Sequence, residues 1–214
     1  MFSMHFYFGF NQQLVQPYLQ NLSHNQVTIV WESASCGTGE LQWGQNNLSN
    51  SVYSSSITAL NNSCIHNVKV QNLLPNTKYY YKAINDSYSS SMFSFQTPPL
   101  NSSEETTRLI AISDMQKDHN HPDVFEKIIN DGIIGHIENN FNGTLSSNLQ
   151  MVLIPGDLVD NGNNHDEWVN DFFDSGKNLF SYVPIYPVLG NHENNSSFFF
   201  NYFNLPKNGS SGYN

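Results

Sequence analysis

The chain has 214 residues, enough for one large domain or two small ones, and its hydrophobic content of 38% allows a packed core. Its formal net charge of −10 argues against a nucleic acid as partner, and a site for an anionic substrate would need metal ions to reverse the local charge. No run of 18 apolar residues occurs, so the sequence predicts no membrane span.

Residues 1–16 carry no assignable element. The apolar start MFSMHFYFGF lacks the basic region and the small-residue cleavage site of a signal peptide. The number of Asn-x-Ser/Thr sequons still favours a glycoprotein of the secretory pathway, either secreted or delivered to a lysosome or vacuole, although a chain rich in Asn and Ser forms several by chance. Cys36 and Cys64 fit one disulfide in an exported protein and two free thiols in a cytosolic one equally well. The sequons begin at Asn21, Asn47, Asn61, Asn85, Asn101, Asn142, Asn194, Asn195 and Asn208.

Residues 17–98 have the pattern of an all-β domain. Short segments in which apolar and polar residues alternate are separated by turn signals, which is typical of a β-sandwich. Tyr79 and Tyr81 fall on one face of such a segment, and we expect that face to point into the core. The expected strands lie near 26–32, 40–44, 51–59, 64–70, 78–84 and 92–96.

Residues 99–107 (PLNSSEETT) predict a linker, and the pattern changes after it. Over 108–214, apolar runs that predict buried strands are separated by segments that predict helices, and this alternation indicates an α/β domain. The strands are expected at 108–113, 151–154 and 185–189.

Two helices are expected between these strands. Apolar residues at positions 124, 125, 128 and 129 have the spacing of one helix face, so a helix is predicted over 123–130, with Asp123 as its cap. A second helix is expected over 167–180, and the polar residues 139–148 predict a loop.

Each predicted strand of the second domain ends in residues that can bind a cation. Asp114 follows the first strand, Asp157 follows the second, and Asn191 and His192 follow the third. Carboxylate, carboxamide and imidazole groups suit Mg, Mn, Fe or Zn, and strand ends are where ligand sites of α/β proteins collect. Taken singly, each has an ordinary explanation: a helix cap or a turn in the first two cases, and a loop pair with a backbone-bonded imidazole in the third.

The other candidates are expected to have no direct metal role. Glu193 would support the ligands or cap a helix, and four histidines would face solvent. These are His119, His121, His136 and His165.

The motifs around Asp114, Asp157 and 190–193, in this order, resemble those of the metallophosphoesterase (calcineurin-like) superfamily. The β-rich segment before them, whose LLPNTKYYY at 73–81 is similar to a fibronectin type III domain, makes the chain resemble the purple acid phosphatase branch from residue 16 onward. The resemblance implies two domains: an all-β fibronectin III-like sandwich, and then the N-terminal part of an α/β (α-β-β-α layered) metallophosphoesterase domain.

The resemblance also implies a mechanism. Two metal ions, Fe with Zn or Mn, would hold a hydroxide that attacks the phosphorus of a small phosphate monoester. Asp114 would bind the first metal, Asp157 would bridge both, and Asn191 would bind the second through its amide oxygen. His192 would act as general acid or stabilise the transition state.

Two rival functions stay open: a phosphodiesterase of the same superfamily, and a catalytically inactive secreted binding module in which the sandwich does the work. Homodimer formation through either domain is also open.

The chain departs from the family pattern at three points. Gln116 stands where the family often has His, and its role as a ligand stays open. Asp160 stands where purple acid phosphatases have Tyr, so we expect a colourless protein even with iron bound. The chain ends at Asn214, before the later histidines of the family, so we expect the N-terminal part of an enzyme with little or no phosphatase activity of its own.

Overall fold

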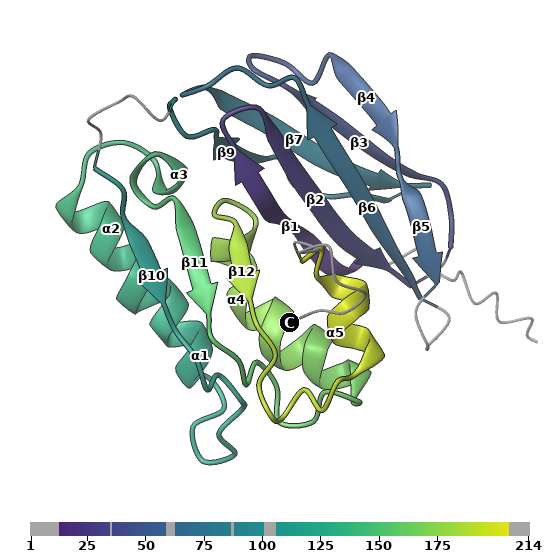
Figure 1. Cartoon of the computed structure of the whole chain (residues 1–214), viewed down its shortest axis with the longest axis vertical. Coiled ribbons are helices and arrows are strands. Elements are labelled where there is room, and N and C mark those ends of the chain that lie inside the picture. Colours follow the sequence, from purple (N-terminus) through teal and green to yellow (C-terminus); the bar gives the residue numbers. More distant parts are fainter. Residues whose placement is uncertain (1–12, 35, 59–62, 87, 101–105, 206–214) are drawn as a thin grey trace, which may run out of the picture.

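The computed structural model describes residues 13–34, 36–58, 63–86, 88–100 and 106–205. A β-sandwich is followed by an α/β domain, and the two pack side by side (Figure 1). This arrangement confirms the two-domain architecture expected from the sequence. The expectations for residues 1–12 and 101–105 lie outside the described residues. No helix within the described residues is long and apolar enough to span a membrane.

The sandwich consists of two antiparallel sheets. The first has the strand order β1-β2-β6-β5, and the second has the order β4-β3-β7-β8, with β9 also paired to β7. The first sheet is formed by β1 (Gln13–Ser23), β2 (Gln26–Ser33), β5 (Ser55–Thr58) and β6 (Cys64–Gln71). The second is formed by β3 (Gly39–Gly44), β4 (Asn50–Tyr53), β7 (Lys78–Asn85), β8 (Tyr88–Ser89) and β9 (Phe93–Gln96).

Alternation of apolar and polar residues explains the central strand β7, in which every second side chain is buried. Tyr79 and Tyr81 face the core as expected, and the Tyr79 hydroxyl accepts a hydrogen bond from the Leu74 amide at 2.9 Å. Of the apolar pair before them, only Leu73 enters the core, because Leu74 is 56% exposed.

Two features of the sandwich differ from the expectation. The strand β1 was not expected, because its polar residues interrupt the alternation, yet it forms the edge of the first sheet. The single strand expected at 51–59 is two strands in different sheets, since β4 pairs with β3 and β5 pairs with β6.

The α/β domain is built on a parallel sheet of order β10-β11-β12, with helices packed against it (Figure 1). Its strands are β10 (Leu109–Ala111), β11 (Met151–Ile154) and β12 (Ile185–Pro187). Its helical elements are α1 (Val124–Lys127), the π-helical η1 (Ile128–Ile134), α2 (Gly135–Asn140), α3 (Leu145–Asn148), the π-helical η2 (Glu167–Phe173), α4 (Asp174–Phe180) and α5 (Ser197–Tyr202).

The helix predicted over 167–180 matches η2 and α4. Near 123–130 the prediction is right in position, but Val124 and Ile128 are exposed and Asp123 makes no capping bond. Its carboxylate instead pairs with the Lys127 ammonium at 2.6 Å. The loop predicted at 139–148 is wrong in part, because α3 lies within it.

One hydrophobic cluster spans the boundary between the two domains, and the sandwich has a second core of its own. Val15, Tyr18, Val30 and Ile65 of the sandwich belong to the same buried cluster as the apolar residues of the α/β domain. Tyrosine hydroxyls bond across this boundary, from Tyr18 to the Tyr202 carbonyl and from Tyr81 to the Ser181 carbonyl, both at 2.7 Å. Burial raises the pKa of Tyr18 and Tyr81 well above the usual range, so both remain donors.

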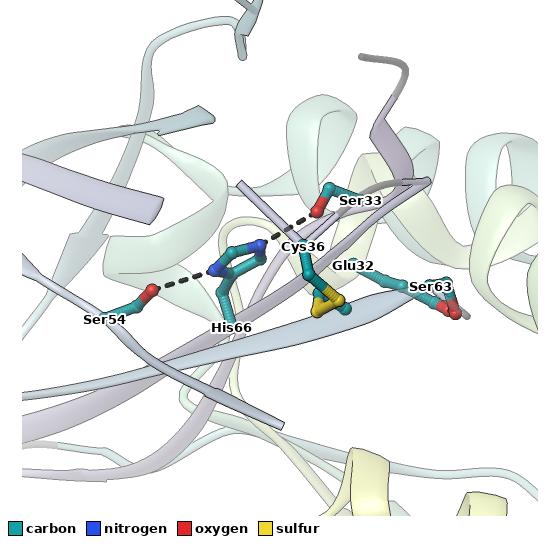
Figure 2. Close-up of a disulfide and its surroundings, with 7 residues drawn as sticks. Glu32, Ser33, Cys36, Ser54, Ser63 and His66 are labelled. Atoms are coloured by element: carbon teal, nitrogen blue, oxygen red, sulfur yellow. Dashed lines mark hydrogen bonds between the residues drawn. A yellow bond between two sulfur atoms is a disulfide. The ribbon is translucent and has the colours of Figure 1, made fainter. Parts of the chain in front are cut away.

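Cys36 and Cys64 form a disulfide that joins the loop after β2 to the start of β6 (Figure 2). The sequence left this pairing open. Cys64 is fully buried and Cys36 is exposed. The bond therefore closes a loop near the rim of the sandwich.

We expect the double substitution Cys36→Ala/Cys64→Ala to destabilise the protein. The two residues lie 28 positions apart, so the lost restraint on the unfolded chain is worth roughly 3–4 kcal/mol. Urea unfolding measures this loss, and wild-type protein in excess reductant should match the variant. Equal midpoints with and without the disulfide would contradict the prediction.

His66 predicts a pH dependence of stability. It is fully buried, stacks on Trp31 at a ring distance of 5.0 Å, and bonds the Ser33 and Ser54 hydroxyls, each at 2.8 Å (Figure 2). Burial lowers the pKa of His66, and the nearby Asp86 opposes this shift only partly. The unfolded chain therefore takes up a proton near pH 6.5 before the folded chain does, and stability present above that pH is lost below it.

His66→Gln is expected to flatten this dependence, because Gln forms hydrogen bonds but does not titrate. The contribution of His66 to the slope of the unfolding free energy against pH is at most about 1.4 kcal/mol per pH unit. Unfolding free energies of the wild type and the variant, measured by urea titration between about pH 7.5 and 5, test it. Parallel curves would show that His66 does not titrate differently in the two states.

Candidate metal centre

The polar residues expected to form a site follow three parallel strands that lie side by side (Figure 1). Val152 of β11 is in register with Ile110 of β10 and with Ile185 of β12. The loops after the three strands therefore leave the same edge of the sheet. Asp114, Asp157 and Asn191 lie in these loops.

Hydrogen bonds hold the three loops against one another. The Met115 amide donates to the Asp157 carbonyl at 3.0 Å, which joins the first loop to the second. The His192 amide donates to Asp157 Oδ1 at 3.1 Å, which joins the second loop to the third. The structure thus brings together the candidate ligands Asp114, Asp157 and Asn191.

Both candidate aspartates have a left-handed backbone. The φ angles are +55° at Asp114 and +54° at Asp157, and Gly156 before the latter has φ +98°. This conformation is uncommon for residues with a side chain, is best tolerated by Asn and Asp, and is concentrated at functional sites. The third loop must also come close: a Cβ on Gly190 would lie 2.0 Å from Asp157 Oδ1, so only glycine fits there.

The Glu193 carboxylate joins two of these loops from below the surface. Glu193 is fully buried, and its oxygens accept four backbone N–H groups. Oε1 accepts from Leu158 at 2.7 Å and Val159 at 3.4 Å, and Oε2 accepts from Gly190 at 2.6 Å and Asp157 at 3.0 Å. These bonds compensate the buried charge and engage both carboxylate oxygens with backbone amides. Glu193 is therefore a support of the loops, as expected.

His192 is oriented by Asp160. Its Nδ1 donates to the Asp160 carbonyl at 2.8 Å and lies 3.3 Å from the Asp160 carboxylate, so the neutral ring carries its proton on Nδ1, and Nε2 carries one only in the protonated ring. This backbone bond, together with the negative charges of Asp157, Asp160 and Glu193, raises the pKa of His192. Asp160 thus positions the imidazole.

The donor chemistry fits part of a cation site. Two carboxylates and one carboxamide are oxygen donors of the kind that hard cations prefer. Asp114 and Gln116 both line a cavity of about 150 Å³ beside α1, so the role of Gln116 as a ligand stays open. Among the described residues, no three or more His, Cys, Asp and Glu form a metal-binding group.

Three of the four histidines expected to face solvent do so. His119, His121 and His136 are exposed. The expectation for His165 was wrong: it is only 8% exposed, and its Nε2 donates to Glu32 of the sandwich at 2.8 Å. Sequence spacing could not reveal this contact, because the partner lies 133 positions away.

Comparison with known proteins gives two family matches. The model of the calcineurin-like phosphoesterase family matches residues 107–214, and that of the purple acid phosphatase N-terminal domain matches residues 13–97. No curated protein sequence matches the chain.

One solved structure shares the fold at low sequence identity. The structure of PhoD superposes with a TM-score of 0.60 at 12% identity, and the match covers 89% of this chain and 40% of that chain. The chain therefore spans less than half of the length of PhoD. A fibronectin type III domain of the human KIAA0970 protein matches with a TM-score of 0.31 at 13% identity, over 43% of this chain and 77% of that one.

We expect Glu193→Gln to destabilise the protein by roughly 2–3 kcal/mol, because the amide would place N–H groups against two backbone N–H donors. Urea unfolding measures the loss. Glu126→Gln, at an exposed position, is the matched control and should stay within about 0.5 kcal/mol of the wild type. Equal stability of the two variants would refute the role given to the buried carboxylate.

Proposed function

The chain belongs to the calcineurin-like phosphoesterase family, and from this premise we propose that it carries the site of a metal-dependent phosphomonoesterase of the acid phosphatase type. The substrate class is a small phosphate ester. The observation that carries the proposal is the convergence of Asp114, Asp157 and Asn191 at one sheet edge, held there by backbone bonds.

The proposed centre contains two metal ions, Fe with Zn or Mn. Bound cations supply the positive charge that a phosphate needs at a site whose own residues carry carboxylates, in a chain of net charge −10. Asp114 would hold the first ion, Asp157 would lie between the two, and Asn191 would hold the second.

His192 is the proposed general acid. The Asp160 carbonyl accepts its Nδ1 proton, so the proton available for the leaving oxygen is on Nε2. The raised pKa of His192 keeps this group protonated to higher pH than a free imidazole. A protonated imidazole at this point both neutralises charge on the ester and assists departure of the alcohol.

Asp157→Asn tests the metal site. Asn tolerates the left-handed backbone as Asp does, so the fold should survive, but the negative charge is lost. Isothermal titration of the 214-residue protein with Mn²⁺ should show binding that is weakened at least about tenfold in the variant. Asp131→Asn, at an exposed position, is the control. Equal Mn²⁺ affinity in all three proteins would exclude Asp157 as a ligand.

Activity assays separate the proposed reaction from its rivals. In a preparation with metal-dependent turnover, p-nitrophenyl phosphate should react faster than bis(p-nitrophenyl) phosphate, and Asp157→Asn should abolish both reactions. The reverse preference would favour a phosphodiesterase. Absence of metal binding in the native protein would favour a binding module built on the sandwich.

We propose that the protein enters the secretory pathway and is either secreted or delivered to a lysosome or vacuole. The disulfide supports an oxidising compartment. The sequon residues Asn47 and Asn142 are exposed, and we propose that they carry N-glycans. Asn85 is only 3% exposed, and the Asn21 amide donates to the Asn204 carbonyl at 2.7 Å, so the folded chain has no room for a glycan at either.

Expression in a eukaryotic secretory host tests this location. Asn47→Gln and Asn142→Gln should each lower the apparent mass by one glycan, and N-glycosidase treatment should remove the difference from the wild type. Asn85→Gln should leave the mass unchanged. Loss of a glycan from Asn85→Gln alone would contradict the proposal.

A further inference from the structure

A buried carboxylate of the sandwich lies at the boundary with the α/β domain. Glu32, at the end of β2, is fully buried. Its Oε1 accepts from His165 Nε2 at 2.8 Å and from the Ser63 hydroxyl, and its Oε2 accepts from the Tyr202 hydroxyl at 2.6 Å. Figure 2 shows Glu32 and Ser63 beside the disulfide. The three donors come from three different segments of the chain.

Burying a carboxylate at a domain boundary costs free energy. A buried carboxylate is tolerated only when it is fully hydrogen-bonded, and apolar residues of similar volume would stabilise the boundary at least as well. What the carboxylate adds is direction, because it holds each donor at one distance and angle. Such a carboxylate is useful where one of its partners needs a defined position.

His165 belongs to the loop 160–167, which lies against the candidate centre. The Asp160 carbonyl of this loop accepts the His192 Nδ1 proton at 2.8 Å, and the Gly162 amide donates to the His192 carbonyl at 3.0 Å. The loop approaches so closely that a Cβ on Gly162 would lie 2.3 Å from the Glu193 carbonyl oxygen. Five positions thus separate the residue bound by Glu32 from the residue that orients His192.

The rest of the loop is held mainly at Gly162, whose carbonyl accepts a hydrogen bond from the buried Trp168 Nε1 at 2.8 Å. Asn161, Asn163 and Asn164 are exposed, whereas His165 is 8% exposed and also packs on Phe198 at a ring distance of 5.2 Å. Without His165, the segment would keep the two bonds of Gly162 and the surface polar bonds of its asparagines, but it would lose its tie to the sandwich.

We propose that Glu32 is a positioning residue of the candidate centre: through His165 it fixes the loop 160–167, and so the Asp160 carbonyl that orients the His192 ring. The inference rests on the proposed role of His192. It makes the β-sandwich a part of the site.

Variants of His165 test this inference without an activity assay. His165→Ala removes the donor to Glu32, and His165→Gln restores an Nε2–H donor of similar reach. His136→Ala, at an exposed histidine, is the matched control. Glu32→Gln removes the charge but keeps one acceptor, so it is preferred to Ala, which would leave three buried donors without a partner.

Two measurements compare the variants with the wild type. Both are made at a temperature well below the unfolding midpoint of the least stable variant. Amide hydrogen exchange of residues 160–166 should be at least about tenfold faster in His165→Ala, with β3 and β7 unchanged. Ring ¹⁵N shifts of His192, at a pH where it is neutral, should move from the Nδ1–H tautomer toward Nε2–H. His165→Gln should restore both toward the wild type.

A purely structural role would lower stability without moving the tautomer. Exchange within twofold of the wild type, or an unchanged tautomer in His165→Ala, would overturn the inference. Hydrolysis assays bear on the proposed function alone, so failure of that function and failure of this inference give different results.

Discussion

The structure depends most on the Glu193 carboxylate, which holds two loops at the edge of the parallel sheet. It accepts backbone N–H groups on both sides of the Asp157 turn and at Gly190, so the turn and the third loop cannot move independently. The left-handed backbone at Asp157 needs such a restraint, because an unsupported residue with a side chain would relax to another region. The candidate ligands are thereby arranged by the protein itself.

The sandwich and the α/β domain pack through one hydrophobic cluster that includes residues of both, beside the sandwich's own core. The boundary also contains directional bonds, among which Glu32 to His165 reaches the loop that orients His192. In the proposed site, the sandwich contributes through the position of the loop that Glu32 holds.

Prediction from the sequence succeeded where a local pattern has a local cause. The alternation in β7, the apolar run of β11 and the helix at 167–180 are each produced by side chains near in sequence, and each was predicted. Prediction failed where the structure of a segment depends on a partner far away in the sequence. Strand β1 exists because β2 pairs with it, and His165 is buried because Glu32 lies 133 positions away.

The sequence by itself determined the two-domain architecture and the residue types at the three strand ends, because hydrophobic periodicity and turn residues act over a few positions. Only the tertiary structure decided that Cys36 and Cys64 pair, that Glu193 turns its carboxylate to backbone amides, and that Asp160 holds the His192 ring. Each of these depends on the distance between segments far apart in the chain, and that distance is established only when the core packs.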